Sequence, residues 1–208
     1  MDYLTLVPTH ELLPRGKRAD SPLDLHRAVM SLFDELPGTP RHGADILFRR
    51  ELIPGMPPSL LVRSSVAPTN ITEHTRVREI INPSPGAATP VAFRIAVNGI
   101  HRVGSGGVRP VAFDDTDAEG DEPTMTPWLQ GRLQGALSDV TCLNHTREVL
   151  GATRPGRGRN GTDHVIQIDT VDGVATVEGP DRLVELMRTG VGRAKSYGCG
   201  LLTVKRLA

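Results

Sequence analysis

The chain has 208 residues, of which 38% are hydrophobic and 3% aromatic, enough to bury the core of one large domain or two small ones. Its formal net charge is zero, which at first argues against a nucleic-acid partner. Six of the 24 Asp and Glu residues, however, lie between Asp114 and Glu122 without a cation, so the remaining 18 face all 24 Lys and Arg. The composition therefore does not exclude an anionic ligand.

The two cysteines, Cys142 and Cys199, are too few for a disulfide framework and form no Cys-x-x-Cys motif. The seven histidines are scattered, with no pair at the spacing of metal ligands. We find no secretion signal and no apolar run of membrane-spanning length. These features predict a cytoplasmic protein without a metal or other cofactor and without a membrane partner.

The chain begins with strand and helix signals in alternation. Residues 3–7 predict a short buried strand, and Ser21-Pro22 supplies a helix cap followed by a proline at the first helical position. The helix is expected to run to about Leu36. His26 lies at the edge of its apolar stripe. The stripe consists of Leu25, Val29, Leu32 and Leu36.

Three more strands complete the first half, over residues 45–52, 60–66 and 77–81. The segment between the last two predicts a degenerate helix or a loop. This order of strands around one helix is typical of a ferredoxin-like domain. Residues 82–86 are dense in proline, glycine and other turn formers, so they predict a linker.

The second half repeats the plan. The predicted elements are strands over 91–97 and 108–113, a helix over 128–137, an extended segment over 139–149, strands over 164–169 and 174–178, a helix over 182–189 and a strand over 201–207. Val171-Asp172-Gly173 is expected to be the turn of a hairpin. The sequence thus predicts an α+β fold of two tandem ferredoxin-like (RRM-like) βαββαβ domains, 1–85 and 90–208.

A glycine-rich loop at residues 190–200 precedes the last strand. It has four glycines interleaved with Arg193 and Lys195, and such a backbone can approach an anionic ligand closely. A Walker A loop needs lysine directly after glycine, but the lysine follows alanine here. A dinucleotide fingerprint fails as well, because Lys195 stands where its third glycine belongs. A flexible surface loop remains the simplest alternative.

Residues 154–161 form a second basic loop, Arg-Pro-Gly-Arg-Gly-Arg-Asn-Gly. Three arginines, Arg154, Arg157 and Arg159, alternate with proline and glycine, which excludes a core element. Such a loop can follow a phosphate backbone, or it can be a disordered turn.

The string Gly-Val-Gly-Arg-Ala-Lys-Ser-Tyr-Gly-Cys-Gly-Leu-Leu at 190–202 resembles the glycine-rich loop and last strand of the CasE family. Asp24-Leu25-His26-Arg27 is a second match and residues 93–98 a weaker third, in the order that the family has over nearly the whole chain. CasE proteins are endoribonucleases of the RAMP superfamily that process CRISPR RNA in the type I-E Cascade complex. The resemblance implies that CRISPR repeat hairpin RNA and other Cascade subunits are partners.

The resemblance also implies roles for individual residues. RNA is cleaved without metal when a base deprotonates the 2′-hydroxyl, the oxygen attacks phosphorus, and an acid protonates the leaving 5′-oxygen, which leaves a 2′,3′-cyclic phosphate. His26 corresponds to the catalytic histidine of the family. Several relatives have tyrosine three residues earlier, where this chain has Leu23. The implied RNA-binding residues are Arg27, Arg154, Arg157, Arg159, Gly192, Arg193, Lys195, Gly198 and Gly200.

Alternatives stay open at several positions. By position alone, His26 is more simply an ordinary surface or half-buried residue, and Arg27 serves a surface salt bridge as readily as a substrate. Gly198 and Gly200 equally suit the close approach of two strands. For the whole chain, the alternative functions are a hairpin-binding RAMP subunit without cleavage activity and a ferredoxin-like metabolite-binding or scaffolding protein.

Overall fold

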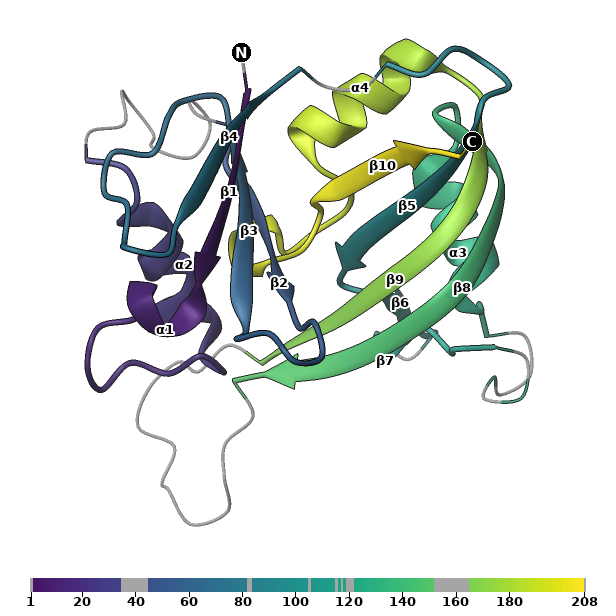
Figure 1. Cartoon of the computed structure of the whole chain (residues 1–208). Coiled ribbons are helices and arrows are strands. Elements are labelled where there is room, and N and C mark those ends of the chain that lie inside the picture. Colours follow the sequence, from purple (N-terminus) through teal and green to yellow (C-terminus); the bar gives the residue numbers. More distant parts are fainter. Residues whose placement is uncertain are drawn as a thin grey trace.

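The computed structural model describes residues 2–34, 45–81, 84–104, 106–114, 116, 118, 122–151 and 165–207. The first half forms a four-stranded antiparallel sheet in the order β2-β3-β1-β4 (Figure 1). That order places the first and third strands at the centre, as in a ferredoxin-like domain. Its elements are β1 (Asp2–Pro8), α1 (Thr9–Leu12), α2 (Pro22–Met30), β2 (Leu47–Glu51), β3 (Ser59–Ser64) and β4 (Arg76–Ile80).

The second half forms its own antiparallel sheet in the order β10-β5-β9-β8, and the small β6–β7 hairpin extends from it. The long β8–β9 pair sweeps across this half of the molecule (Figure 1). The elements are β5 (Pro90–Val97), β6 (Ile100–Arg102), β7 (Val108–Pro110), α3 (Met125–Leu133), β8 (Leu137–Leu150), β9 (Ile166–Val177), α4 (Pro180–Thr189), the 3₁₀ turn η1 (Lys195–Tyr197) and β10 (Leu202–Arg206).

Both sheets have the 4-1-3-2 strand order of the ferredoxin-like plan, so the predicted α+β fold with two tandem ferredoxin-like halves is confirmed. The first half departs from the ideal plan because residues 65–75, between β3 and β4, form turns instead of a second helix. The last strand of the first sheet ends at Ile80 and the first strand of the second begins at Pro90.

Helix α2 begins where its sequence predicts and ends earlier. The Ser21 hydroxyl accepts a hydrogen bond from the Asp24 amide at 3.2 Å, as a helix cap should. The helix ends at Met30, whereas we predicted it to reach about Leu36. The Leu32 carbonyl instead accepts the amides of Thr69 and Asn70, at 2.9 and 3.1 Å, so a neighbouring loop takes the place of further helical turns.

The predicted hairpin turn at residues 171–173 is wrong, because β9 runs unbroken through it. Gly173 pairs with Phe93 of β5 on one side and with Cys142 of β8 on the other. A Cβ at Gly173 would lie 2.4 Å from the Thr141 carbonyl oxygen and 2.5 Å from Cζ of Phe93. The glycine therefore makes room for an aromatic ring on the sheet, and its presence does not signal a turn.

The halves share one of the two hydrophobic cores. One core lies within the second half, whereas the other combines α2 and the first sheet with residues from β5, β8, β9 and the glycine-rich loop. The residues that the second half contributes to this shared core are Ala96, Leu150, Ile168 and Cys199.

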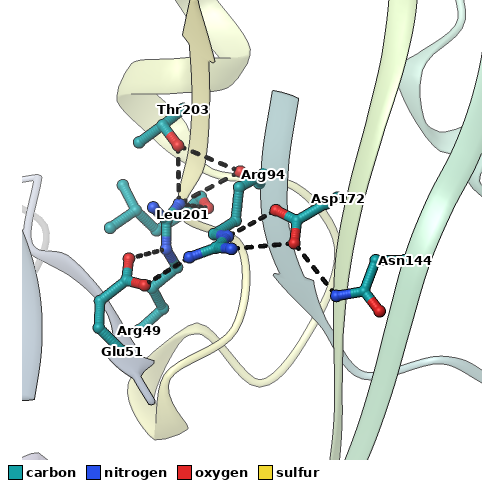
Figure 2. A network of polar contacts seen from close by, with 7 residues as sticks. All are labelled: Arg49, Glu51, Arg94, Asn144, Asp172, Leu201 and Thr203. Atoms are coloured by element: carbon teal, nitrogen blue, oxygen red, sulfur yellow. Dashed lines mark hydrogen bonds and ion pairs between the residues drawn. The ribbon is translucent and has the colours of Figure 1, made fainter. Parts of the chain in front are cut away.

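A buried polar network also joins the halves (Figure 2). Arg49 of β2, only 4% exposed, donates to Thr203 Oγ1 at 2.9 Å and to the Leu201 carbonyl at 3.3 Å, both near β10. Its Nε pairs with Glu51 at 2.7 Å, and Glu51 pairs with Arg94 of β5 at 2.9 Å. These bonds hold β2 beside β10 and β5, which fixes the first half against the loop before β10.

Candidate functional site

His26 lies in a shallow crevice where α2, β2 and η1 meet. Its imidazole is half-buried and lies near Phe48 on the wall formed by the first half. Lys195 and Ser196 of the glycine-rich loop form the opposite wall. The fold therefore brings together two segments that are about 170 residues apart in the sequence. The other lining residues are apolar: Val29, Met30 and Ile46.

Backbone hydrogen bonds join the two ends of the glycine-rich loop and fix the loop to β5. The Val191 amide donates to the Gly200 carbonyl at 3.0 Å, and the Gly200 amide donates to the Ala96 carbonyl of β5 at 2.6 Å. Inside this closure, Ala194 has a φ of 56° and starts η1, whose Tyr197 amide donates back to the Ala194 carbonyl at 2.9 Å. The loop therefore presents η1 to α2 in a fixed position.

The predicted glycines divide into two kinds. Gly198 and Gly200 are buried, and a Cβ on them would lie 3.2 Å from Phe48 and 3.0 Å from the Val191 carbonyl, respectively. Both positions therefore leave little room for a side chain, and their role in RNA binding stays a prediction. Gly192 is exposed, has a φ of 75°, and would have nothing within 4 Å of a Cβ, so its backbone is open to a ligand.

The predicted cations have different surroundings. The Lys195 ammonium donates to the Thr189 carbonyl at 2.6 Å, where α4 ends, while the same residue lines the His26 crevice. The Arg27 side chain is 62% exposed and lies 4.0 Å from Asp24. Arg193 is exposed and faces a second cavity, described below.

The arginines of the other basic loop, Arg154, Arg157 and Arg159, lie outside the described residues. Their segment joins the ends of β8 and β9, where Leu150 pairs with Ile166.

Leu23, at the position where the resemblance to the CasE family led us to expect tyrosine, offers no proton. Leu23 is 39% exposed and lies one helical turn before His26. Ser196, which no sequence motif singles out, lines the crevice directly, and Tyr197 follows it in η1. Only the fold identifies Ser196, because a serine in a loop has no distinguishing spacing.

The crevice therefore combines a half-buried imidazole with a hydroxyl and an ammonium-bearing side chain. Such a set can move protons and hold an anion near neutral pH. Within the described ranges, no three His, Cys, Asp or Glu side chains are grouped as a metal site requires. In the same part of the chain, no helix is long and apolar enough to cross a bilayer.

A family model described as CRISPR associated protein matches residues 3–206. The chain belongs to this family. Among curated members, the Cascade subunit CasE of Escherichia coli K12 is 26% identical over 200 residues, which cover 88% of this chain and 93% of the relative. This CRISPR-associated chain therefore matches the relative over almost its whole length.

Solved structures agree with the family fold. Cse3 of Thermus thermophilus, bound to an RNA that represents a pre-cleavage complex, superposes with a TM-score of 0.69 at 22% identity over 98% of both chains. The CRISPR-associated protein Cas6e of E. coli K-12 superposes with a TM-score of 0.65 at 21% identity over 100% of both chains. The chain therefore has the fold of these two proteins.

Proposed function

We propose that this protein is an endoribonuclease that cleaves CRISPR precursor RNA at its repeat hairpins, without a metal ion, and keeps the product. The observation that carries the proposal is the shared crevice of His26 and η1. Family membership over residues 3–206 and the similarity to CasE and Cse3 supply the substrate class.

The reaction needs two proton transfers around one phosphodiester. A base takes the 2′-hydroxyl proton, the 2′-oxygen bonds to phosphorus, and the bond from phosphorus to the 5′-oxygen breaks. An acid protonates that leaving oxygen, so the products are a 2′,3′-cyclic phosphate and a 5′-hydroxyl. His26 performs one of these transfers. The hydroxyl of Ser196, which lines the crevice, orients the phosphate, or Tyr197 next to it supplies the second proton.

The remaining predicted residues bind the RNA. Arg27 lies one residue after His26 with an exposed guanidinium, and Gly192 and Arg193 offer an open backbone and a cation at the other end of the loop. Lys195 stabilises the phosphorane charge if its ammonium leaves the Thr189 carbonyl when RNA binds. The arginine loop at 154–161 contacts the hairpin near a helix end, where an A-form groove is accessible.

We place the protein in the cytoplasm, as a subunit of a Cascade assembly like its relative CasE. Cys142 and Cys199 are both free thiols, which suits a reducing compartment.

A second candidate is a hairpin-binding subunit without cleavage activity. Leu23 favours it, since this position lacks the tyrosine that several relatives have. The two functions differ in a single observable, the breaking of the phosphodiester.

The test is cleavage of a labelled repeat hairpin in EDTA under single-turnover conditions. The proposal expects a cyclic phosphate product from the unaltered chain, and none from a hairpin with a 2′-deoxy scissile nucleotide. His26→Ala should slow cleavage by about 10²- to 10⁴-fold while hairpin affinity is retained. His10→Ala is the matched control, because His10 is exposed on α1. Binding without cleavage by the unaltered chain selects the second candidate.

A further inference from the structure

A second cavity borders the first residues of the glycine-rich loop. It has a volume of about 290 Å³, at the lower end of the sizes typical of small-molecule sites. Its walls come from α3, the β6–β7 hairpin, the end of β5 and the first residues of the glycine-rich loop. The cavity and the His26 crevice share no lining residue, although the glycine-rich loop borders both.

One wall offers an aromatic platform. Trp128 of α3 is half-buried and packs on the core of the second half, and it is the only tryptophan in the chain. Arg132 lies one turn later on the same helix, and its guanidinium carbon is 4.9 Å from the indole ring centroid. Indole rings and guanidinium planes are the surfaces on which proteins stack unpaired nucleobases.

The other walls carry two more arginines. Arg102 at the end of β6 and Arg193 of the glycine-rich loop both line the cavity, and both are exposed like Arg132. Among the residues that the structure describes, no ion pair involves any of these three arginines. Three guanidinium groups around one cavity favour an anionic ligand, and planar donors suit phosphate oxygens in particular.

The wall that carries Arg102 is held rigidly. The Gly99 amide, just before β6, donates to the fully buried carboxylate of Asp169 at 3.0 Å. The Val111 amide, just after β7, donates to the Gly99 carbonyl at 2.8 Å. Arg147 donates to Asp169 at 2.7 Å and to the Val111 carbonyl at 2.5 Å. Since both ends of the hairpin are anchored, the cavity is preformed.

The glycine-rich loop borders both this cavity and the His26 crevice. Gly192 and Arg193 line the cavity, whereas Lys195 and Ser196 line the crevice. Only Ala194 separates the two pairs, so the Cα atoms of Arg193 and Lys195 lie at most about 7–8 Å apart. One RNA strand of a few nucleotides can therefore occupy both.

We propose that this cavity binds one unpaired nucleotide of the RNA next to the cleaved phosphodiester. The base stacks on the Trp128–Arg132 platform, and Arg102 and Arg193 bind its phosphate. The choice of RNA rests on the proposed function, but the binding of a nucleotide by the cavity does not.

The experiment uses the fluorescence of Trp128, which reports on this cavity alone because the chain has no other tryptophan. The probes are adenosine monophosphate and single-stranded hexaadenylate RNA, titrated into the full chain. We expect saturable quenching by both, and competition by inorganic phosphate, which has no base and should not quench. The proposal is overturned if either adenosine monophosphate or hexaadenylate fails to quench the fluorescence saturably.

Variants separate the platform from the charges. Arg102→Gln and Arg193→Gln should each weaken hexaadenylate binding and reduce its dependence on salt. Arg132→Gln and Trp128→Leu, the latter measured by filter binding, should weaken it by about 5- to 100-fold. Arg132→Gln keeps the test valid if Trp128→Leu does not fold. Arg78→Gln is the matched control, because Arg78 is exposed on β4 in the first half.

The outcomes are distinct from those of the cleavage assay. No hairpin is present in the fluorescence titration. A titration without saturable quenching therefore rules out the nucleotide site but does not affect the proposal of hairpin cleavage. Loss of the proposed nuclease function, conversely, leaves saturable quenching unchanged. If Arg132→Gln and Arg102→Gln bind hexaadenylate normally but fail to join other Cascade subunits, the cavity is a protein contact and the proposal is wrong.

Discussion

Gly198 and Gly192 show how two glycines of one loop differ in what they do. Both have a positive φ, 94° and 75° respectively, which strains any other residue. Only Gly198 is also packed against Phe48, whereas Gly192 faces open space. Sequence spacing gives no means of separating them, because burial depends on which element lies across the loop.

Alanine substitutions test this difference. Gly198→Ala should lower the free energy of unfolding by about 2–3 kcal/mol, from strain together with crowding of the Phe48 ring. Gly192→Ala should lower it by about 1–2 kcal/mol, from strain alone. Urea unfolding of both variants measures the difference. Equal losses would mean that Phe48 does not constrain the loop.

Asp169 is a second residue whose role is visible only in the fold. Burial alone would raise its pKa, but hydrogen bonds from His145, Gln167 and Arg147 outweigh burial and hold the pKa below the ordinary value of a carboxyl group. The folded state therefore binds a proton at this site less readily than the unfolded state. The resulting stability is present above the unfolded pKa of about 4 and is lost as pH falls through the folded pKa.

The pH dependence of unfolding tests the role of Asp169. Stability of the unaltered chain should fall as the pH drops below about 4. Asp169→Asn should be less stable at neutral pH and should show a smaller fall in that range. Urea midpoints measured from pH 7 downward give both curves. Parallel curves would show that Asp169 does not contribute to acid sensitivity.

At the scale of elements, the sequence predicted the starts of structures better than their ends. The cap at Ser21 correctly placed the start of α2, since capping depends on neighbouring residues alone. The end of that helix depends on the loop around Thr69, which is 37 residues from its partner Leu32, and the predicted end lay too far along the chain. Local signals cannot report such distant partners.

Strand β9 also shows that contacts with distant residues can override a local sequence signal. Asp172 and Gly173 are residues that favour turns. In the fold, however, Asp172 forms an ion pair with Arg94, and Gly173 leaves room for the Phe93 ring. The contacts across three strands outweigh the local preference for a turn.

Gly173→Ala tests this explanation. An added Cβ would lie 2.4 Å from a backbone oxygen of β8, so neighbouring strands must shift. We expect a loss of about 1–3 kcal/mol in the free energy of unfolding, measured by urea titration. A matched change on the same strand, Thr176→Ala, removes a half-buried side chain and should cost less. If Gly173→Ala is neutral, packing of Phe93 does not explain the unbroken strand.

At the scale of the whole molecule, the two halves form one unit. The plan of two ferredoxin-like halves was predictable because apolar patterns and turn formers repeat along the chain. The shared core and the Arg49 network were not, because nothing in a local pattern marks an arginine that will be buried between domains. His26 and the glycine-rich loop were likewise identified one by one, but their common crevice depends on this docking.

Arg49→Met tests the docking. Its loss leaves Glu51 buried with only Arg94 as a partner, and removing one member of a buried ion pair costs about 3–5 kcal/mol. Since Arg94 remains, we expect the lower end of this range. Unfolding is followed by circular dichroism, which reports on both halves, and by Trp128 fluorescence, which reports on the second half. In the unaltered chain the two unfolding curves should coincide. Separate transitions would show that the halves fold independently.

The most direct test of the central claim is a crystal structure of the chain with an uncleaved repeat hairpin that has a 2′-deoxy scissile nucleotide. We predict that the scissile phosphate lies in the crevice between α2 and η1. A ring nitrogen of His26 should then be within about 2.6–3.2 Å of the leaving 5′-oxygen, directly or through one water, or of the point that the missing 2′-oxygen would occupy. A scissile phosphate bound away from His26, with the hairpin otherwise held, would contradict the account.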